Sequence, residues 1–313
     1  MRQQSDHKQS WRGRVAVLTP RDDFRHQLSG LLARESQFLT VPLAAEGLNI
    51  HLYWWVDGAG MAGRVVGLFS NDNRRLLFDR KDGIAMGHYD FDDWRIAGLE
   101  IAHRQALEVA DYRYADNSFA FSLHFQAMHR AFAYSENADG CPPSMADDRF
   151  EQSGRVHGHL TLGGRRIEFD TWGHRDHSWG QRDYAAMHHF KWVSTASADG
   201  TALNGFQLLA AGEQTINGYL FRDGVLAPLV TFDNRVEYDP GLAPLALESR
   251  LTDRLGRVAL VSSRRFSHLR WEALPIVMDD IGCRSEVDGV AGVAHIGLAW
   301  TRAYLDQRLA TPA

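Results

Sequence analysis

The sequence has few cysteines, no long apolar run and no apolar leader. Its only cysteines are Cys141 and Cys283 in 313 residues, which excludes a disulfide framework and a four-cysteine zinc cluster and favours a reducing compartment. No run approaches the ~18 consecutive apolar residues of a membrane span. Residues 1–10 are polar and lack the apolar stretch of a secretory signal, so a cytoplasmic protein is expected.

The charge balance argues against nucleic acid as a partner. The chain carries 34 basic and 39 acidic residues, a formal net charge of −5, and no block of Lys and Arg. Hydrophobic residues make up 44% and charged residues 23% of the chain, which excludes a disordered chain, a collagen-like chain and a coiled coil. The mean hydropathy of −0.33 is that of a soluble globular chain, with enough core to hold a buried small molecule.

Turn signals occur along the whole chain. Asp-Gly and Gly-Gly pairs tolerate the positive φ angles of two-residue hairpin turns. These pairs lie at 57–58, 82–83, 139–140, 163–164, 199–200, 223–224 and 288–289. Their spacing predicts many short antiparallel strands joined by hairpins.

Apolar and polar residues alternate between the turns, which predicts half-buried strands. In the segment 48–57 the even positions share one face and the odd positions, including Tyr53 and Trp55, share the other. The segment 118–127 alternates in the same way, and 156–170 has the pattern of a hairpin. Further strand-like segments lie near 189–196, 203–210, 215–222, 225–231, 247–253, 257–264, 267–274 and 293–300.

Helical patterns are few. The segment 23–36 has Phe24, Leu28, Leu31 and Leu32 at helical spacing, and 301–310 is a second candidate. Many short strands with few helices favour an all-β barrel or sandwich. The polar stretch 135–152 is interpreted as a linker between two domains or as a long loop.

Two glycine-containing motifs resemble known sites but lack the required context. Gly58, Gly60 and Gly63 have dinucleotide-binding spacing, yet a strand-like segment follows them where the pyrophosphate site needs a helix. We therefore interpret this stretch as a hairpin loop. The segment 176–180 resembles a nucleophile elbow but lacks its first glycine and its strand–turn–helix setting, which argues against a hydrolytic serine.

The histidines give no clear metal signal. The pairs considered are His157 with His159 and His188 with His189. A metal site needs three or four convergent ligands with supporting groups behind them, and linear spacing shows no such convergence. The prediction is therefore that neither a metal nor another cofactor is required.

Ionisable residues are densest in the run Gly173–Asp183, of sequence GHRDHSWGQRD. One interpretation is a structural turn, in which Arg175 and Arg182 neutralise Asp176 and Asp183 while a tryptophan fills the core. The other is a functional site, in which a cation and an imidazole hold an acid beside an apolar cavity.

This run and its surroundings resemble a known family. Besides 173–183, the matching segments are the G-R-V-x-G-x-L stretch at 154–160, Arg25-His26 with Glu35-Ser36, and the C-terminal stretch 289–300. Together they resemble the hydroxyneurosporene synthase or carotenoid 1,2-hydratase-like family. His295 stands where an acidic residue is expected. Ser178 stands where the carotenoid hydratases usually have Asn, so the sequence is more similar to other bacterial members of the superfamily.

The resemblance implies an all-β chain with two lipocalin-like antiparallel β-barrels, few short helices, and a ligand cavity at or between the barrels. It implies domains at 1–170 and 171–313, with the boundary anywhere in 135–175. Its relatives include hydratases of isolated alkenes and Diels–Alderases, none of which needs a redox cofactor. The expected function is a cofactor-independent hydratase, dehydratase or isomerase acting on a hydrophobic terpenoid, steroid or polyketide-like molecule.

Acid catalysis fits the residues of the run. Adding water to an unactivated alkene, or removing it from a tertiary alcohol, passes through a carbocation-like state that needs a proton donor and an electron-rich face. Asp176 is the expected donor, because burial raises the pKa of a carboxylic acid, and His177 is expected to orient it or to handle water. A close Arg175 would lower that pKa unless it pairs with Asp183 or Glu168. The expected substrate-binding residues are Trp179, Tyr184, Arg175, Tyr53, Trp55 and His124.

Two other functions remain open at this point. A non-catalytic lipocalin-like protein would bind the same hydrophobic molecule and use Arg175, Asp176 and Arg182 only as a structural ion-pair network. A pericyclase would depend on the shape of its cavity and need no acid. The oligomeric state is left open.

Overall fold

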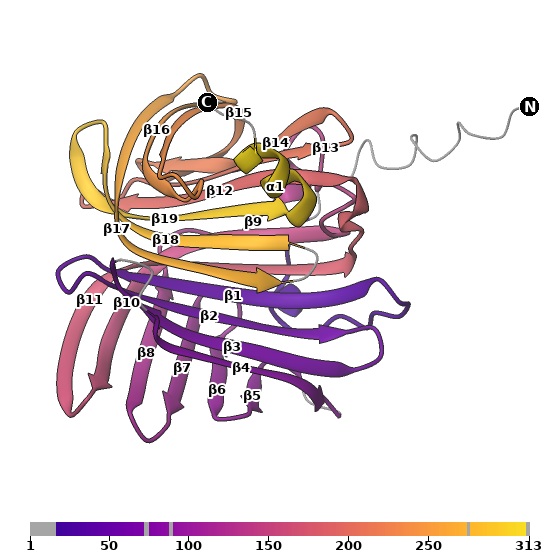
Figure 1. Ribbon diagram of the computed structural model, residues 1–313, viewed down its shortest axis with the longest axis vertical. Helices are drawn as coiled ribbons and strands as arrows, with labels where there is room; N and C mark the ends of the chain where they lie inside the picture. Colours follow the sequence, from indigo (N-terminus) through magenta and orange to yellow (C-terminus); the bar gives the residue numbers. More distant parts are fainter. Residues whose placement is uncertain (1–16, 72–74, 88–89, 274–275, 311–313) are drawn as a thin grey trace, which may run out of the picture.

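The computed structural model describes residues 17–71, 75–87, 90–273 and 276–310, and these fold into two antiparallel sheets (Figure 1). Residues 1–10, where a leader was sought, lie outside these ranges. The first sheet contains β1 (Ala33–Leu43), β2 (Leu48–Asp57), β3 (Met61–Phe69), β4 (Arg75–Ala85), β5 (Asp93–Ile96), β6 (Leu99–Gln105), β7 (Val109–Ala115), β8 (Phe119–Ala127), β9 (Phe132–Ala133), β10 (Asp148–Leu162) and β11 (Arg165–Gln181). Among the described residues, no helix is long and apolar enough to cross a membrane.

The second sheet closes into an eight-stranded barrel. Its strands are β12 (Met187–Ser197), β13 (Ala202–Ala210), β14 (Glu213–Arg222), β15 (Val225–Tyr238), β16 (Pro244–Asp253), β17 (Val258–Ala273), β18 (Ile276–Val287) and β19 (Val290–Thr301). Each strand pairs with the next in sequence, and β19 returns to pair with β12. The predicted all-β architecture with few helices is thereby confirmed.

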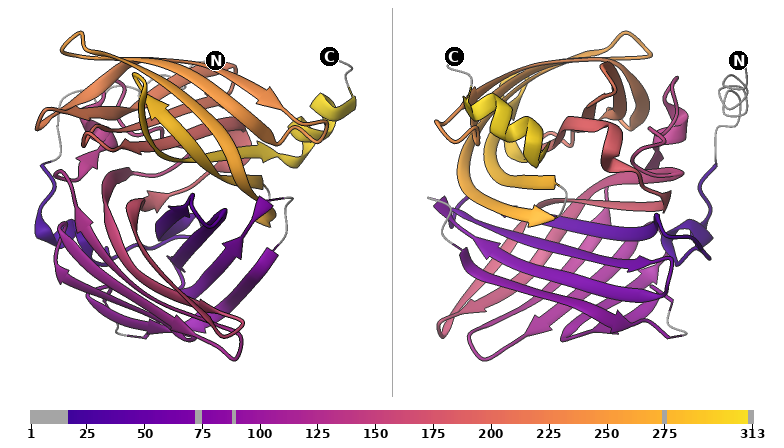
Figure 2. Two further views of the ribbon diagram at one scale, coloured as in Figure 1. Left: turned by 90° about the vertical axis from the view of Figure 1, so that its left-hand side faces the viewer. Right: turned by 45° about the vertical axis from the view of Figure 1, so that its right-hand side comes forward.

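The first sheet curves strongly without closing through its backbone (Figure 2). Its order is β4-β3-β2-β1-β11-β10-β8-β7-β6-β5, so β4 and β5 are its two ends. Buried Arg64 on β3 links these ends, since its Nε donates to the carbonyl of Ala97 at 3.1 Å and its Nη1 to that of Asp79 at 2.7 Å. Tyr114 on β7 donates its hydroxyl to the Asp79 carboxylate at 2.8 Å. Side chains therefore complete the closure that the backbone leaves open.

Apolar side chains form one core inside each sheet and a third layer between them. Alternation along β2 explains the division, because Trp54 packs into the core of the first sheet while Tyr53 and Trp55 face the second. In the layer between the sheets, Phe38 of β1 meets Trp192 of β12 with ring centroids 5.0 Å apart. Both faces of β1 and β2 are thus covered, as their near-complete burial requires.

The helix predicted over 23–36 is wrong. Only a short 3₁₀ helix, η1 (Pro20–Asp23), occurs there, and β1 begins at Ala33. The apolar spacing does not mark a buried stripe, because Leu31 and Leu32 are exposed. Pairing of β1 with both β2 and β11 outweighs the local helical preference. The second candidate is confirmed as α1 (Arg302–Ala310).

Most predicted strands are found, with two differences in the second sheet. The segments predicted at 257–264 and 267–274 form the single strand β17, and β18 was not predicted. The chain passes from the first sheet to the second between Gln181 and Met187, through the 3₁₀ turn η4 (Tyr184–Ala186). The division into domains at 170/171 stays a prediction.

Candidate active site between the two sheets

Strand alternation divides the charged run on β11 between two opposite faces of the first sheet. Asp176 and Ser178 line a cavity between the two sheets. Their neighbours Arg175 and His177 point into the first sheet, where Arg175 pairs with Asp23 and His177 with Glu35. The run is therefore not one site, because neighbouring residues of a strand point in opposite directions.

The cavity between the sheets has a volume of about 340 Å³. Strands β1, β2, β10 and β11 form one side, and β12, β17 and β18 form the other. Of the predicted site residues, Asp176, Tyr53, Trp55 and Tyr184 line it. Its aromatic wall consists of Phe38, Tyr53, Trp55, Tyr184, Phe190, Trp192 and Trp271. Charged and polar side chains, among them Arg34, Arg149, Asp176 and Arg182, converge on the same cavity. An enclosed space that combines aromatic walls with convergent polar groups is typical of a small-molecule site.

Asp176 faces this cavity beside a second carboxyl group. Arg149 on β10 donates from Nη2 to Asp176 Oδ2 at 2.7 Å and from Nε to Glu151 Oε1 at 2.5 Å. Glu151 lies directly opposite Asp176 in the β10–β11 register, and its Oε2 is hydrogen-bonded to His174 Nε2 at 2.7 Å. One guanidinium thus joins two buried carboxyl groups.

The pKa values of both carboxyl groups lie well above the ordinary range of a carboxylic acid. Burial raises the pKa of Asp176 to about 7; Arg149 opposes this rise, and the charge of Glu151 adds to it. Burial also raises the pKa of Glu151 to about 7, again against Arg149. Desolvation is the largest contribution to both pKa values, and it outweighs Arg149 at both groups and the more distant charge of Arg182 at Asp176. The pair titrates as a unit, and Asp176 is the member that lines the cavity.

A phenol and two arginines form a second polar group in the cavity. Burial alone would raise the pKa of Tyr53, but nearby Arg34 and Arg182 lower it to about 8. Arg34 Nη2 donates to the Tyr53 hydroxyl at 3.2 Å, and buried Arg182 donates to Ser36 Oγ at 2.8 Å. Within the described ranges, neither arginine forms an ion pair with a carboxylate. Their charge is available to an oxygen atom in the cavity.

Asp280 of β18 also lines the cavity with its carboxyl group. Trp271 Nε1 donates to its Oδ2 at 2.6 Å, and His295 Nε2 lies 3.0 Å from its Oδ1. Burial would raise the pKa of Asp280, but His51, His295 and these hydrogen bonds lower it. Burial lowers the pKa of His51 to about 4, so this ring is neutral near pH 7. Asp280 is therefore ionised near neutral pH. It lies beside His295, the residue that stands where the family resemblance leads one to expect an acidic side chain.

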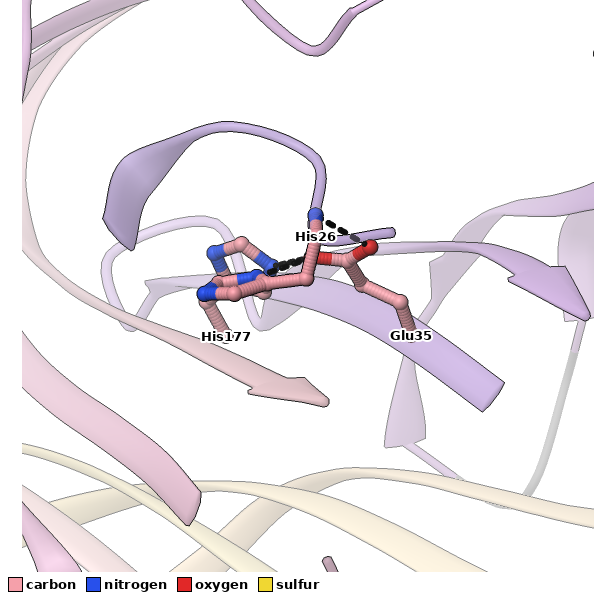
Figure 3. A group of neighbouring side chains, drawn as sticks. All are labelled: His26, Glu35 and His177. Atoms are coloured by element: carbon pink, nitrogen blue, oxygen red, sulfur yellow. Dashed lines mark hydrogen bonds and ion pairs between the residues drawn. The ribbon is translucent and has the colours of Figure 1, made fainter. Parts of the chain in front are cut away.

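The remaining predicted residues lie outside the cavity. His177 Nε2 and His26 Nδ1 lie 2.8 and 2.7 Å from Glu35 Oε1, inside the first sheet (Figure 3). Trp179 stacks on His26 with ring centroids 4.2 Å apart. His124 lies on β8, where it pairs with Asp111 at 2.8 Å and stays partly exposed. These residues cannot contact a ligand in the cavity together with Asp176.

The group His26, Glu35 and His177 has ligand types suited to a metal, with ligand atoms within 4.8 Å of one another. The amide nitrogen of Gln37 donates to the carbonyl of Asp23 at 3.1 Å and lies 3.3 Å from His177 Nδ1. Since this nitrogen only donates, neutral His177 carries its proton on Nε2, the atom that faces Glu35. The group therefore fits a hydrogen-bonded His–Glu–His cluster better than a metal site, which needs a free lone pair there.

The histidines first considered as metal ligands do not converge. His157 and His159 lie on β10 of the first sheet, and His188 and His189 lie on β12 of the second.

Sequence reasoning missed Arg149, Glu151 and Asp280. The first two lie within 135–152, the stretch interpreted as a linker or loop, although β10 begins at Asp148. Asp280 lies on the strand that was not predicted. Asp148–Gly154 at the start of β10 are all buried, and their polar sequence shows no alternation that would have marked them as a strand.

Gly63 of β3, which pairs with Trp55 of β2, allows a test of the cavity wall. A Cβ at Gly63 would lie 2.2 Å from Trp55 Cζ2 and 2.8 Å from the carbonyl of Lys81. We expect Gly63→Ala to displace the indole, destabilise the fold by about 1–3 kcal/mol and weaken binding of a hydrophobic ligand. Gly67→Ala on the same strand is the control, because its nearest contact would be an ordinary 3.5 Å to His51. Thermal melts and dye binding of both variants check this, and equal behaviour would contradict it.

Several solved structures share this fold. An AttH-like protein from Nitrosomonas europaea matches with a TM-score of 0.71 at 15% identity, over 92% of this chain and 98% of that one. Kievitone hydratase from Nectria haematococca matches with a TM-score of 0.61 at 11% identity, over 91% and 93%. CghA, solved with Sch210972, matches with a TM-score of 0.61 at 12% identity, over 86% and 89%. At these identities the likeness establishes a shared fold.

Comparison by sequence places the chain in a family. No curated protein sequence matches it. A family model described as "Domain of unknown function (DUF7064)" matches residues 19–302, which is most of its length. The chain belongs to the DUF7064 family.

Proposed function

We propose that the protein is an acid–base enzyme, a hydratase, dehydratase or isomerase, acting on a hydrophobic small molecule in the cavity between the sheets. One observation carries the proposal: the Asp176 carboxyl lines a cavity with an aromatic wall, where burial raises its pKa to about 7. A general acid works best when its pKa lies near the working pH. Kievitone hydratase, which shares the fold, supports the reaction class by its name.

The proposed hydration begins with transfer of the Asp176 proton to one carbon of a carbon–carbon double bond. The other carbon becomes electron-poor, and an aromatic face of the cavity wall such as that of Phe38 stabilises it. Water then adds to this carbon, and its extra proton returns to the Asp176 carboxylate. The acid is regenerated, and the reverse sequence removes water from an alcohol. No redox cofactor enters this scheme.

The arginines narrow the proposed substrate class. Arg34 and Arg182 line the cavity without carboxylate partners in the described part of the chain. Guanidinium groups donate to oxygen acceptors, and their charge would oppose an isolated carbocation beside them. We infer that the substrate has an apolar, terpenoid-, steroid- or polyketide-like frame with an oxygen atom at these arginines. The reacting double bond then lies toward Asp176.

The ion pair between Asp176 and Arg149 favours a second candidate, a non-catalytic binding protein. In that case the carboxyl would serve only to neutralise the guanidinium. Glu151 already pairs with Arg149, so neutralisation does not require Asp176. This excess of carboxyl groups is why we favour catalysis.

The more specific family assignment, the need for a cofactor, the location and the domain division are also proposed and not established. The resemblance to hydroxyneurosporene synthase stays a prediction, since the solved structures of this fold are named as kievitone hydratase, CghA and an AttH-like protein. The absence of a cofactor, the cytoplasmic location and the two-domain division also stay predictions from the sequence.

Solvent labelling tests the reaction class. Small molecules that co-purify with the protein are identified by mass spectrometry and incubated with it in ¹⁸O-labelled water. A hydratase working in both directions exchanges the hydroxyl oxygen, so the ligand should gain the heavy isotope with wild-type protein and not with Asp176→Asn. Binding without any exchange or rearrangement of the ligand would favour the binding protein.

A further inference from the structure

The lumen of the closed barrel contains a second pocket, separate from the cavity between the sheets. It has a volume of about 220 Å³ and lies at the end of the barrel beside α1. Residues directly opposite each other on neighbouring strands point to the same face of the sheet. His189 of β12 lies opposite Leu209 of β13 and Trp300 of β19, so these three side chains point together into the lumen. The pocket is lined by His189, Lys191, Gln207, Leu209, Gln214, Tyr238, Leu242, Trp300, Tyr304 and Arg308. No residue of this set lines the first cavity.

The charges of this pocket have one sign. Its lining includes Lys191 and Arg308 but no aspartate or glutamate, although the whole chain carries a net charge of −5. Lys191 Nζ donates to the neutral Gln207 Oε1 at 3.0 Å and, in the described ranges, forms no ion pair with a carboxylate. A carboxylate nearby in the lumen, Asp279, is held by His268 Nε2 at 2.7 Å and by an arginine. A half-buried ammonium without a counter-ion favours an anionic ligand.

A buried imidazole adds a specific requirement. His189 is 8% exposed, and its Nδ1 lies 2.8 Å from the carbonyl of Ala299. A carbonyl only accepts, so Nδ1 carries the proton and Nε2 of the neutral ring has its lone pair free. This Nε2 is buried without a hydrogen-bond partner in the described structure. A buried acceptor without a hydrogen bond raises the free energy of the folded protein, so a ligand that donates a hydrogen bond to Nε2 would be favoured at this site.

Aromatic rings form the apolar part of the pocket. His189 stacks on Trp300 with centroids 3.9 Å apart, and Trp300 stacks on Tyr304 of α1 at 6.0 Å. Tyr238 lies 6.3 Å from Trp300. Flat faces of this kind favour a planar apolar group in the ligand.

We propose that this pocket binds a small aromatic carboxylate that also carries a hydroxyl group. The carboxylate pairs with Lys191, with Arg308 at the rim, and the hydroxyl donates to His189 Nε2. The ring lies against Trp300 and Tyr304. This site is independent of the proposed reaction at Asp176.

Calorimetric titration with 4-hydroxybenzoate tests the proposal. We expect saturable binding to the wild type and at least about tenfold weaker binding to Lys191→Met, which keeps the length of the side chain but removes its charge. Exposed Lys81 on β4 gives the matched control, and Lys81→Met should bind as the wild type does. Benzoate lacks the hydroxyl group and 4-hydroxybenzamide lacks the charge, so each should bind more weakly.

The indole N–H signal of Trp300 locates the ligand. We expect 4-hydroxybenzoate to shift this NMR signal, identified through its loss in Trp300→Phe. If Lys191→Met does not fold, Arg308→Gln on the surface helix should still weaken binding. Absence of binding to the wild type, unchanged affinity in the Lys191 or Arg308 variant, or shifts confined to the indoles of the first cavity would each overturn the proposal. Asp176→Asn should bind the probe normally, which separates this site from the proposed reaction.

Discussion

Asp176→Asn is expected to lower turnover by about 10²–10⁴-fold while binding of the hydrophobic ligand stays nearly unchanged. Asparagine keeps the shape of the side chain and can still accept from Arg149 Nη2, but it has no acidic proton. Turnover of the wild type should also fall as pH rises through about 7, where Asp176 loses its proton. Rate measurements across pH on both proteins check the prediction.

Stability separates this catalytic role from a structural one. The pKa of Asp176 is raised in the fold above its unfolded value of about 4, so folding loses stability as pH rises from about 4 to about 7. Asparagine does not ionise, so Asp176→Asn should not lose stability over this pH range. At pH 8 its melting temperature should be no lower than that of the wild type. A lower melting temperature with unchanged turnover would identify a structural ion pair instead. Exposed Asp170 on the same strand provides the control, and Asp170→Asn should change neither property.

Asp23→Asn is expected to destabilise the fold by about 3–5 kcal/mol. Asp23 is fully buried, 3.0 Å from Arg175 Nη1, and accepts from the backbone N–H of Leu107 at 2.6 Å. Without its charge, the Arg175 guanidinium is left buried and uncompensated. Denaturant unfolding measures the loss. Glu168→Gln, in an exposed pair with Arg166, should cost less than about 1 kcal/mol.

The contribution of Asp23 depends on pH in a defined direction. Burial would raise its pKa, but Arg175, His103 and Leu107 lower it to about 2, below the unfolded value of about 4. A lowered pKa stabilises the fold above the unfolded value, and this stabilisation is lost as pH falls from about 4 to about 2. The difference in stability between wild type and Asp23→Asn should therefore shrink across that window. A constant difference would show that the charge of Asp23 is not what stabilises the fold.

The strands could be predicted because alternation and hairpin turns are local properties. The segment 48–57 became β2 with both of its predicted faces, and Gly163-Gly164 became the turn between β10 and β11. The segment 23–36 failed because its helical spacing is also local, while the pairing of β1 with β2 and β11 is not.

The site could be predicted only in part, because its partners come from distant strands. Asp176 was found through its own run, but Arg149 and Asp280 reach the same cavity from β10 and β18. The run also joined residues that belong to different faces, such as Asp176 and His177. Alternation along a strand separates such neighbours once the strand is recognised, but the register between strands decides which residues meet.

Titration of the aspartate carboxyl groups shows without any substrate whether Asp176 can act as the acid. Aspartate labelled with ¹³C at the side-chain carboxyl carbon is incorporated, and each signal is followed by NMR as a function of pH. We expect one aspartate signal to titrate with an apparent pKa near 7, and we expect this signal to be missing in Asp176→Asn. If the signal missing in that variant titrates below about pH 5 in the wild type, Asp176 is an ordinary ion-paired carboxylate and cannot be the proposed acid.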